Sequence, residues 1–403
     1  MSASQTPLRV ALGGVGGYGN NYVKYLLDAG AAHGARVVAA ADPAPAGCKR
    51  LAELQALGIP VVASLDEALA AAPADLVVLS TPIPLHAAQT CAALAQGAHV
   101  LCEKPLCASV EDARAMFVAR AKANRQVAVG YQWSFSETTL ALKRDILAGR
   151  FGAPRRLKTL VLWPRDWAYY HRNRWAGRLC DDQGRPVLDS PVNNAVAHYL
   201  HHMLYLLGDR TDRSLRPNSV TAELYRANAI ENYDTAMLRA RAANGLEVLF
   251  TASHAVQRTV NPVCHFEFEQ ATVTFDETTG NHFVARFANG ETKDYGSPDQ
   301  LDQKLWTTLD CIRSGEPVPC GLEATSSHTV CMLGVQQSAD IAPFPAELVR
   351  STGSGDKAIV SVDGLAEMLE RCHAANRLPS ESGVAWARRG KEIALAPLFN
   401  ALA

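Results

Sequence analysis

The chain has 403 residues, a length that favours two domains over a single hydrophobic core. Its 39 basic and 40 acidic residues leave a net charge of -1, so no strong field attracts nucleic acid or an anionic membrane surface. The longest apolar-looking stretch, residues 63–79, is interrupted by three acidic residues and a proline, which excludes a membrane span there. We therefore expect a small-molecule partner, and neither nucleic acid nor a membrane.

The first ten residues contain no basic stretch followed by an apolar run, so we expect no export signal and a cytoplasmic location. The ten cysteines form no Cys-x-x-Cys pair of the kind that zinc and redox sites use. In that compartment we expect them to be free thiols, mostly small buried side chains.

Short β-branched runs alternate with alanine-rich helical stretches from residue 8 to about residue 130. This alternation is typical of a doubly wound parallel sheet covered by helices, so we assign residues 1–130 to one α/β domain. The six predicted strands, each apolar enough to be buried on both faces, span residues 8–12, 36–41, 59–63, 75–79, 98–102 and 126–130.

Beyond that region the predicted strands follow one another, which indicates an antiparallel sheet. These strands span residues 220–228, 234–242, 246–254 and 263–268, and predicted helices span 136–148, 299–314 and 322–339. We assign residues 131–342 to an α+β domain built on an open, mainly antiparallel sheet. Residues 343–403, with an apolar run at 358–362 and a helix at 365–374, are expected to form a C-terminal extension that packs on the body.

The first predicted strand runs directly into Gly14-Val-Gly16-Gly17-Tyr18-Gly19 and then into a helical stretch. A strand, G-x-G-x-x-G and a helix in this order form the fingerprint of a dinucleotide-binding turn in a Rossmann domain. Gly14 permits the tight turn, Gly16 lets the backbone approach a pyrophosphate, and Gly19 lets the helix lie close to the strand. Gly17 and Tyr18 complete the turn, and the N–H groups at the helix N-terminus favour phosphate.

An acidic residue, Asp42, closes the second predicted strand 23 residues beyond Gly19. A carboxylate at about this spacing accepts hydrogen bonds from adenosine ribose hydroxyls and repels a 2′-phosphate, which favours NAD over NADP. The alternative is that Asp42 only begins the turn with Pro43. Lys49 and Arg50 could reach a phosphate, but a place on the solvated face of a helix fits them better.

Polar residues follow the fourth and fifth predicted strands, where a ligand of an open parallel sheet binds. Thr81, Pro82 and His86 follow the fourth strand, and we expect them at the cofactor, although a simple strand-ending turn explains Thr81-Pro82 as well. Glu103 and Lys104 follow the fifth strand, precede Pro105 and are also expected at the cofactor. Lys104 is the first catalytic candidate, with a surface lysine before a turn as the alternative, and Glu103 is expected to orient the loop or pair with a cation.

With Gly130-Tyr131 added, these motifs resemble the glucose-fructose oxidoreductase and inositol dehydrogenase (Gfo/Idh/MocA) family over roughly residues 8–340. The resemblance implies that Lys104 contacts a substrate hydroxyl and that the bond before Pro105 is strained or cis. It also implies that Thr81-Pro82 contacts the cofactor, that Tyr131 lies at the substrate, and that an exposed sheet face forms a homodimer or homotetramer.

The family places an aspartate and a histidine one helical turn apart in the second domain. Here Asn194 stands where the aspartate is expected, and His198 falls on the histidine. Because asparagine cannot accept a proton, His198 is expected to transfer the proton alone or with Asp189 as its partner. His201 and His202 add histidines at ligand-like spacing, but no Cys or Glu completes a set nearby, so we predict no metal site.

Residues 163–175 concentrate aromatic rings and guanidinium groups, a composition that suits a carbohydrate. The predicted substrate-binding residues are Tyr131, Trp133, Arg165, Tyr170, Arg172, Trp175 and His198. The alternative is that the aromatic residues pack an interdomain core or an oligomer interface. The arginines also suit an acidic sugar or a phosphate, so the charge of the substrate stays open.

Together these features predict an NAD-dependent oxidoreductase that moves a hydride between nicotinamide and a secondary alcohol or ketone of a sugar, polyol or cyclitol. Lys104 polarises the reacting oxygen, His198 shuttles the proton, and the cleft between the domains holds the substrate. Two alternatives stay open: an NAD-dependent glycosidase that oxidises its sugar transiently, and a non-catalytic NAD-binding sensor.

Overall fold

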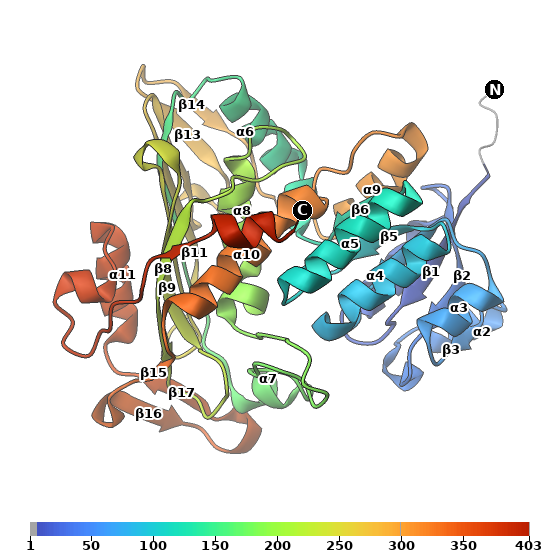
Figure 1. Cartoon of the computed structure of the whole chain (residues 1–403), viewed down its shortest axis with the longest axis horizontal. Coiled ribbons are helices and arrows are strands. Elements are labelled where there is room, and N and C mark those ends of the chain that lie inside the picture. Colours follow the sequence, from blue (N-terminus) through green and yellow to red (C-terminus); the bar gives the residue numbers. More distant parts are fainter. Residues whose placement is uncertain (1–5, 299, 403) are drawn as a thin grey trace. The chain divides into compact units, whose positions relative to one another are not determined.

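The computed structural model describes residues 6–298 and 300–402, which form two compact units. The first unit comprises the chain up to Ser136 together with Gln300–Thr325, and the second comprises nearly all of the rest. Residues 1–5 and 403 of the predicted domains lie outside the described residues, as does residue 299 at the start of predicted helix 299–314. Figure 1 traces both units.

The first unit is built on a six-stranded parallel sheet with the strand order β3-β2-β1-β4-β5-β6. Its strands are β1 (Leu8–Gly13), β2 (Ala35–Ala41), β3 (Val61–Val62), β4 (Leu76–Leu79), β5 (His99–Cys102) and β6 (Val127–Val129). All six predicted strands are therefore present. Their apolar residues are buried because helices pack against the sheet, α1 and α3 against β1 and β2, and α4 against β4 and β5.

Two of the six helices of this unit begin at a serine whose side chain caps the helix. The six helices are α1 (Gly19–Ala29), α2 (Leu51–Ala56), α3 (Leu65–Ala71), α4 (His86–Ala95), α5 (Val110–Ala123) and α9 (Gln303–Ser314). Ser64 caps α3 in a capping box with Glu67, and Ser109 accepts a hydrogen bond from the Asp112 amide at the start of α5. Asn124 ends α5 in the left-handed conformation.

The segment 300–325 belongs to the first unit, whereas the sequence placed it with residues 131–342. Its carbonyl groups accept hydrogen bonds from residues at the edge strand β6. The Val129 amide donates to the Cys320 carbonyl at 2.8 Å, and the Gln126 side chain donates to the Cys311 carbonyl at 3.0 Å. Arg120 of α5 also pairs with Glu323 at 2.6 Å. This return pairs residues almost 200 positions apart, so no local sequence pattern indicates it.

The second unit is built on a ten-stranded open sheet. Nine of its strands have the order β14-β13-β12-β11-β7-β10-β9-β8-β15, and the tenth, β18, pairs with β8. The strands are β7 (Pro154–Leu162), β8 (Ser219–Arg226), β9 (Thr235–Arg241), β10 (Glu247–Ser253), β11 (Val260–Phe268), β12 (Ala271–Phe275), β13 (Val284–Phe287), β14 (Thr292–Asp294), β15 (Ala342–Pro343) and β18 (Ile393–Ala394). The pairs β7–β10 and β8–β15 are parallel and the others are antiparallel, which confirms the predicted sheet.

The helices of the second unit cover this sheet on both faces. They are α6 (Glu137–Leu147), α7 (Trp167–His171), α8 (Ala197–Leu206), α10 (Leu322–Ser338, which begins in the first unit), α11 (Leu365–Ala375) and α12 (Ala396–Asn400). A hairpin of β16 (Val349–Thr352) and β17 (Ile359–Val362) precedes α11. The rings of His202 in α8 and Phe266 in β11 face each other on one side of the sheet, and α11 packs against β7 and β10 on the other.

The C-terminal segment covers part of the sheet face that the resemblance left exposed for a partner subunit. Its apolar side chains, among them Leu365 and Leu369, form one buried cluster with Leu160 and Leu162 of β7. The predicted free face is therefore closed over the middle strands of the sheet, because the chain supplies its own apolar partner for them.

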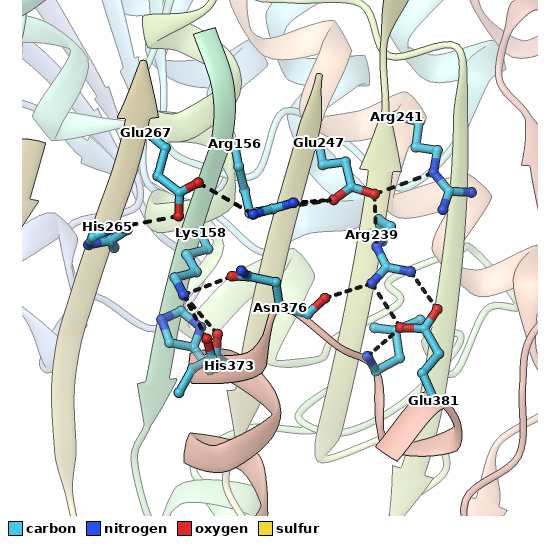
Figure 2. A network of polar contacts seen from close by, with 12 residues as sticks. Arg156, Lys158, Arg239, Arg241, Glu247, His265, Glu267, His373, Asn376 and Glu381 are labelled. Carbon is cyan, nitrogen blue, oxygen red and sulfur yellow. Dashed lines mark hydrogen bonds and ion pairs between the residues drawn. The ribbon is translucent and has the colours of Figure 1, made fainter. Parts of the chain in front are cut away.

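Charged side chains continue this contact where the apolar cluster ends (Figure 2). Lys158 of β7 donates to the His373 carbonyl at 2.9 Å and to the Asn376 side-chain oxygen at 2.8 Å, at the C-terminal end of α11. A cation at that end is favoured because the last carbonyls of a helix carry partial negative charge. Beside it, Arg239 of β9 pairs with Glu381 of the 3-10 turn Pro379–Ser382.

The next features concern membrane-spanning helices, metal-binding groups and cysteines in the described part of the chain. Within residues 6–298 and 300–402, no helix is long and apolar enough to cross a membrane. The same residues contain no group of three His, Cys, Asp or Glu side chains that could hold a metal ion. All ten cysteines are free, as expected, and eight of them are buried.

We predict that acid weakens the fold through buried histidines, and that His373 carries a measurable part of this effect. Burial first, and then the charges of Lys158 and His265, lower the pKa of His373 to about 3. The unfolded chain, with an ordinary histidine pKa near 6.5, therefore binds the proton first, so stability falls as the pH drops from about 6.5 towards 3. Between pH 7 and pH 5, His373→Leu should remove about 2 kcal/mol of this loss.

Urea midpoints measured at pH 7, 6 and 5 test this expectation, with His171→Leu as the control. The His171 side chain is 61% exposed and lies in the same unit. An acid-dependent loss that is the same in both variants and the wild type would show that His373 does not couple protonation to unfolding.

Candidate active site

The glycine-rich turn after β1 has two glycines that packing requires, Gly14 and Gly19, and one, Gly17, that faces open space. A Cβ on Gly14, which has a φ of +83°, would lie 2.8 Å from the Ser80 carbonyl oxygen, and one on Gly19 would lie 2.2 Å from the Gly14 carbonyl oxygen. Gly14 and Gly19 therefore make the turn and the close helix approach that the motif predicts. Beside Gly17 a Cβ would meet no atom within 4 Å, so the outer side of the turn is open to a phosphate at the start of α1.

Asp42, at the end of β2, is tied to this turn. Its Oδ2 accepts hydrogen bonds from the Val15 amide at 3.0 Å and the Gly16 amide at 3.1 Å, while its Oδ1 accepts one from the Ala44 amide at 2.8 Å. The carboxylate therefore begins the Asp-Pro turn and also lies against the glycine-rich turn, and its role in binding a ribose stays a prediction. Its partial exposure leaves room for a ribose hydroxyl, which fits a dinucleotide.

The basic residues near Asp42 are engaged on the protein surface. Arg50, directly before α2, forms ion pairs with Asp28 and Glu53. The Lys49 amide donates to the Asn20 side chain at 2.7 Å. Lys49 is exposed and the Arg50 side chain is 26% exposed, so both reach solvent, but they lie before α2 and not on the face of a helix.

His86 lies under the loops rather than facing a ligand. It is 1% exposed, and its ring nitrogens lie 2.9 Å from the Thr81 carbonyl oxygen and 2.8 Å from the Pro105 carbonyl oxygen. Burial lowers its pKa. The prediction that His86 touches the cofactor is therefore corrected: the ring joins the loop after β4 to the loop after β5.

The loop after β5 contains the predicted Glu103-Lys104-Pro105 sequence, and its Lys104–Pro105 bond is cis, as the resemblance implied. Lys104 is partly exposed, whereas Glu103 is 8% exposed. Glu103 accepts hydrogen bonds from the Tyr22 hydroxyl at 2.7 Å and from the Lys104 amide at 3.2 Å. A Cβ on Gly130 would lie 2.8 Å from the Glu103 carboxylate, so glycine is required there.

Lys304 of α9 is the cation that pairs with Glu103, and the sequence analysis missed it. Its side chain has no exposed surface, and its ammonium group contacts the Glu103 carboxylate and lies 3.0 Å from the Tyr18 hydroxyl. Burial alone would raise the pKa of Glu103, but the charge and hydrogen bond of Lys304 outweigh it and lower that pKa. Lys304 thus joins the Glu103 loop to Tyr18 of the glycine-rich turn.

The other predicted residues of the first unit, Tyr131 and Trp133, are buried beyond β6. Tyr131 is 1% exposed and Trp133, in the 3-10 turn Gln132–Phe135, is 4% exposed. The expectation that Trp133 presents a ring face to a sugar is therefore corrected for this conformation, because packing covers the ring.

The predicted residues of the second unit centre on Asp189, which is 2% exposed. Its carboxylate accepts hydrogen bonds from the Gly177 amide at 2.6 Å and from the Asn194 Nδ2 at 2.7 Å, and Arg172 lies 3.6 Å away. Asn194 belongs to the π-helical turn Pro191–Ala195, and α8 with His198 begins after a break at Val196. The predicted continuous helical face is thus interrupted. Asp189 is bonded to Asn194 on this stretch, and its partnership with His198 stays a prediction.

The neighbouring histidines of α8 have packing roles. His202 is 1% exposed, its Nε2 lies 3.3 Å from the Thr139 hydroxyl, and burial lowers its pKa to about 3. His201 is 1% exposed and stacks on Tyr205. Neither meets other ligands in a metal-binding group among the described residues.

The aromatic and arginine residues of 163–175 stack on one another. The Arg172 guanidinium lies 3.7 Å from the centre of the Tyr169 ring and 5.4 Å from that of Trp175. Arg165 lies 4.6 Å from the same Tyr169 ring. The cluster is therefore a cation–π stack around Tyr169, a residue that the sequence analysis did not select.

Comparison with known proteins agrees with this architecture. Residues 8–131 match a family described as "Oxidoreductase family, NAD-binding Rossmann fold". Inositol 2-dehydrogenase from Klebsiella pneumoniae (strain 342) is 30% identical over 203 residues, which cover 50% of this chain and 55% of that protein. The chain thus spans about half the length of the curated relatives it matches.

Solved structures extend the likeness over both units. An oxidoreductase from Agrobacterium radiobacter in complex with NAD+, L-tartaric acid and magnesium has a TM-score of 0.66 at 19% identity, covering 81% of this chain and 95% of that chain. The WlbA dehydrogenase from Bordetella pertussis in complex with NADH and UDP-GlcNAcA has a TM-score of 0.66 at 23% identity, covering 82% and 95%. At these identities the likeness shows a shared fold.

The parallel sheet, the glycine-rich turn and the family match define the first unit as an NAD-binding Rossmann fold, followed by an α+β unit. The match to this family of oxidoreductases covers residues 8–131, and beyond them the likeness to solved structures is one of fold.

We predict that Lys304→Met destabilises the protein by about 3 to 5 kcal/mol, because it leaves the Glu103 carboxylate buried without its cation. Lys304→Met combined with Glu103→Gln should recover much of that loss, since no charge is then buried unpaired. Denaturant midpoints of the wild type, both single variants and the double variant give the coupling energy. Additive effects of the two substitutions would show that the pair does not act as a unit.

Proposed function

We propose that the protein is an NAD-dependent dehydrogenase that acts on a secondary alcohol or ketone of a sugar, polyol or cyclitol. The observation that carries this proposal is the position of Lys104 directly after β5, in the same parallel sheet as the glycine-rich turn after β1 and two strands away from it. Ligands of such sheets bind beyond the carboxyl ends of the strands. The inositol 2-dehydrogenase relative supports the substrate class.

In this proposal the nicotinamide, when bound, supplies the hydride acceptor or donor at one carbon of the substrate. The Lys104 ammonium donates a hydrogen bond to the reacting oxygen and stabilises the negative charge that develops on it. His198 accepts the proton during oxidation and returns it during reduction. Asn194 takes no part in proton transfer, because an amide cannot accept the proton. Asp189 positions this part of the chain through its hydrogen bond to Asn194.

NAD is the proposed cofactor, in preference to NADP. The Asp42 carboxylate lies against the glycine-rich turn, where it favours ribose hydroxyls and repels a 2′-phosphate. Arg50, one of the two nearby cations that could bind such a phosphate, pairs with Asp28 and Glu53. We further propose a cytoplasmic location. As the family resemblance implies, we also propose a homodimer or homotetramer, formed through the part of the sheet face that the C-terminal segment leaves uncovered.

The purified protein, incubated with NAD and a panel of sugars, cyclitols and aryl glycosides, should form NADH with at least one free sugar or cyclitol. Lys104→Met should lower kcat by about 10² to 10³, because the positioned hydrogen-bond donor is lost from the transition state. NAD affinity, measured by calorimetry, should change little. Absorbance of NADH and release of aglycone are followed in the same samples.

The other outcomes separate the rival functions. Aglycone release that requires NAD without net NADH would favour the glycosidase reaction. NAD binding with neither signal across the panel would favour a sensor and contradict the proposed dehydrogenase.

We predict that Asp42→Asn lowers the preference for NAD over NADP by about tenfold or more, since the charge that repels the 2′-phosphate is removed. Dissociation constants for both cofactors test this, with Asp66→Asn, an exposed carboxylate on α3 of the same unit, as the control for net charge. An unchanged ratio with intact NAD binding would leave Asp42 with the turn as its only role.

A further inference from the structure

The second unit contains a small, partly open pocket beside Asp189. It is formed by the segment between β7 and α8, the approach to β9 and the residue that follows β10. Its lining consists of Tyr169, Tyr170, Gly177, Asp189, Ser190, Pro191, Ile230, Tyr233 and His254. The space accommodates about one group of the size of a water molecule.

Two buried side chains of the lining have polar atoms that no other described residue satisfies. His254 is 2% exposed, and its Nδ1 lies 2.8 Å from the Trp163 carbonyl oxygen. Because a carbonyl accepts, Nδ1 carries the proton, and Nε2 has a lone pair without a partner among the described residues. The Tyr170 hydroxyl, on a side chain that is 6% exposed, is likewise without a hydrogen-bond partner there.

The rest of the lining defines the chemistry of a matching group. Asp189 contributes a carboxylate, and the Ser190 hydroxyl donates to the Tyr233 hydroxyl at 3.0 Å. None of the nine lining residues is a lysine or an arginine. Outside the lining, Arg172 lies 3.6 Å from Asp189, and both Arg172 and Arg165 stack on Tyr169. A hydroxyl group can donate to His254 and accept from Tyr170, whereas an anion would meet a lone pair and a carboxylate.

We propose that this pocket binds one neutral hydroxyl or hydroxymethyl group of the substrate, and thereby selects uncharged polyols and sugars over carboxylated or phosphorylated ones at that position. The inference rests on the proposed function, and it answers the question of substrate charge that the arginine-rich sequence left open. Burying polar atoms without hydrogen-bond partners lowers the stability of the fold, and a substrate hydroxyl that bonds to both atoms removes this cost.

The position of the pocket links this selection to the proposed chemistry. Asp189 forms part of the pocket wall and also accepts the hydrogen bond from Asn194, four residues before His198. A hydroxyl bound here is therefore held against the carboxylate that positions the proton-transfer segment. Burial and the charge of Arg165 lower the pKa of His254 to about 3, so its ring stays a neutral acceptor at physiological pH.

Two variants remove one polar atom each and keep the surroundings. Tyr170→Phe removes the hydroxyl alone, and His254→Asn keeps a donor for the Trp163 carbonyl while it removes the Nε2 acceptor. His265→Asn is the matched control, because His265 lies on β11 outside the pocket. The full chain is loaded with NAD and probed with myo-inositol, D-glucose, D-glucuronate, D-glucose 6-phosphate and the monodeoxy forms of the neutral compound that binds.

For the neutral compound that binds, Kd by calorimetry and KM in turnover should rise about 3- to 10-fold in each pocket variant and stay unchanged in the control. One deoxy form should bind the wild type more weakly by a similar factor and be insensitive to both variants, because the group that the pocket holds is already missing. The charged compounds should gain nothing from either substitution.

The proposal fails if the variants weaken all deoxy forms equally or have no effect, which would make the pocket a site for a structural water only. It also fails if no neutral compound binds, or if glucuronate or the phosphate binds more tightly than the neutral sugars and depends on Tyr170. Binding of a neutral compound that responds to the variants without any NADH formation would sustain the pocket and instead overturn the proposed dehydrogenase activity.

Discussion

The ammonium group of Lys304 has no exposed surface and lies on the carboxylate of Glu103, which is itself almost fully buried. The free energy lost when two charges leave water exceeds the attraction between them unless further hydrogen bonds satisfy both groups. Here Tyr22 and the Lys104 amide donate to Glu103, and the Tyr18 hydroxyl satisfies Lys304. The pair therefore fixes two loops at once, one from β5 and one from the glycine-rich turn.

Other features of the first unit follow from this pair. Position 130 must be glycine because the Glu103 carboxylate occupies the space of a side chain. The chain has to return at residues 300–325 because α9 supplies the cation, and this return also completes the edge of β6. His86 holds the same loop from its other end through the Pro105 carbonyl. The segment that presents Lys104 is thus fixed on each side by buried polar contacts.

The sequence predicted the structural features that depend on residues close together in the chain. Six parallel strands, the glycine-rich turn and its open side follow from local apolar patterns and from the conformational freedom of glycine. Contacts between distant residues left no such pattern. Lys304 lies 201 residues from Glu103, and in the sequence it is an ordinary lysine in a helix. His254 is the last residue of a predicted strand and belongs to no motif, and only its position beside Tyr170 and Asp189 indicates a role.

The replacement of the expected aspartate by Asn194 preserves more than the sequence alone indicates. Its Nδ2 is committed to Asp189, so the oxygen of the same amide is fixed as the end that can accept a hydrogen bond. That is the hydrogen-bond polarity a carboxylate would have, without the charge or the ability to take a proton. The negative charge is instead held on Asp189, one hydrogen bond further away and 3.6 Å from Arg172. In the proposed site, Asn194 would thus present an oriented hydrogen-bond acceptor, and Asp189, beside the Tyr169 cluster, would hold the negative charge.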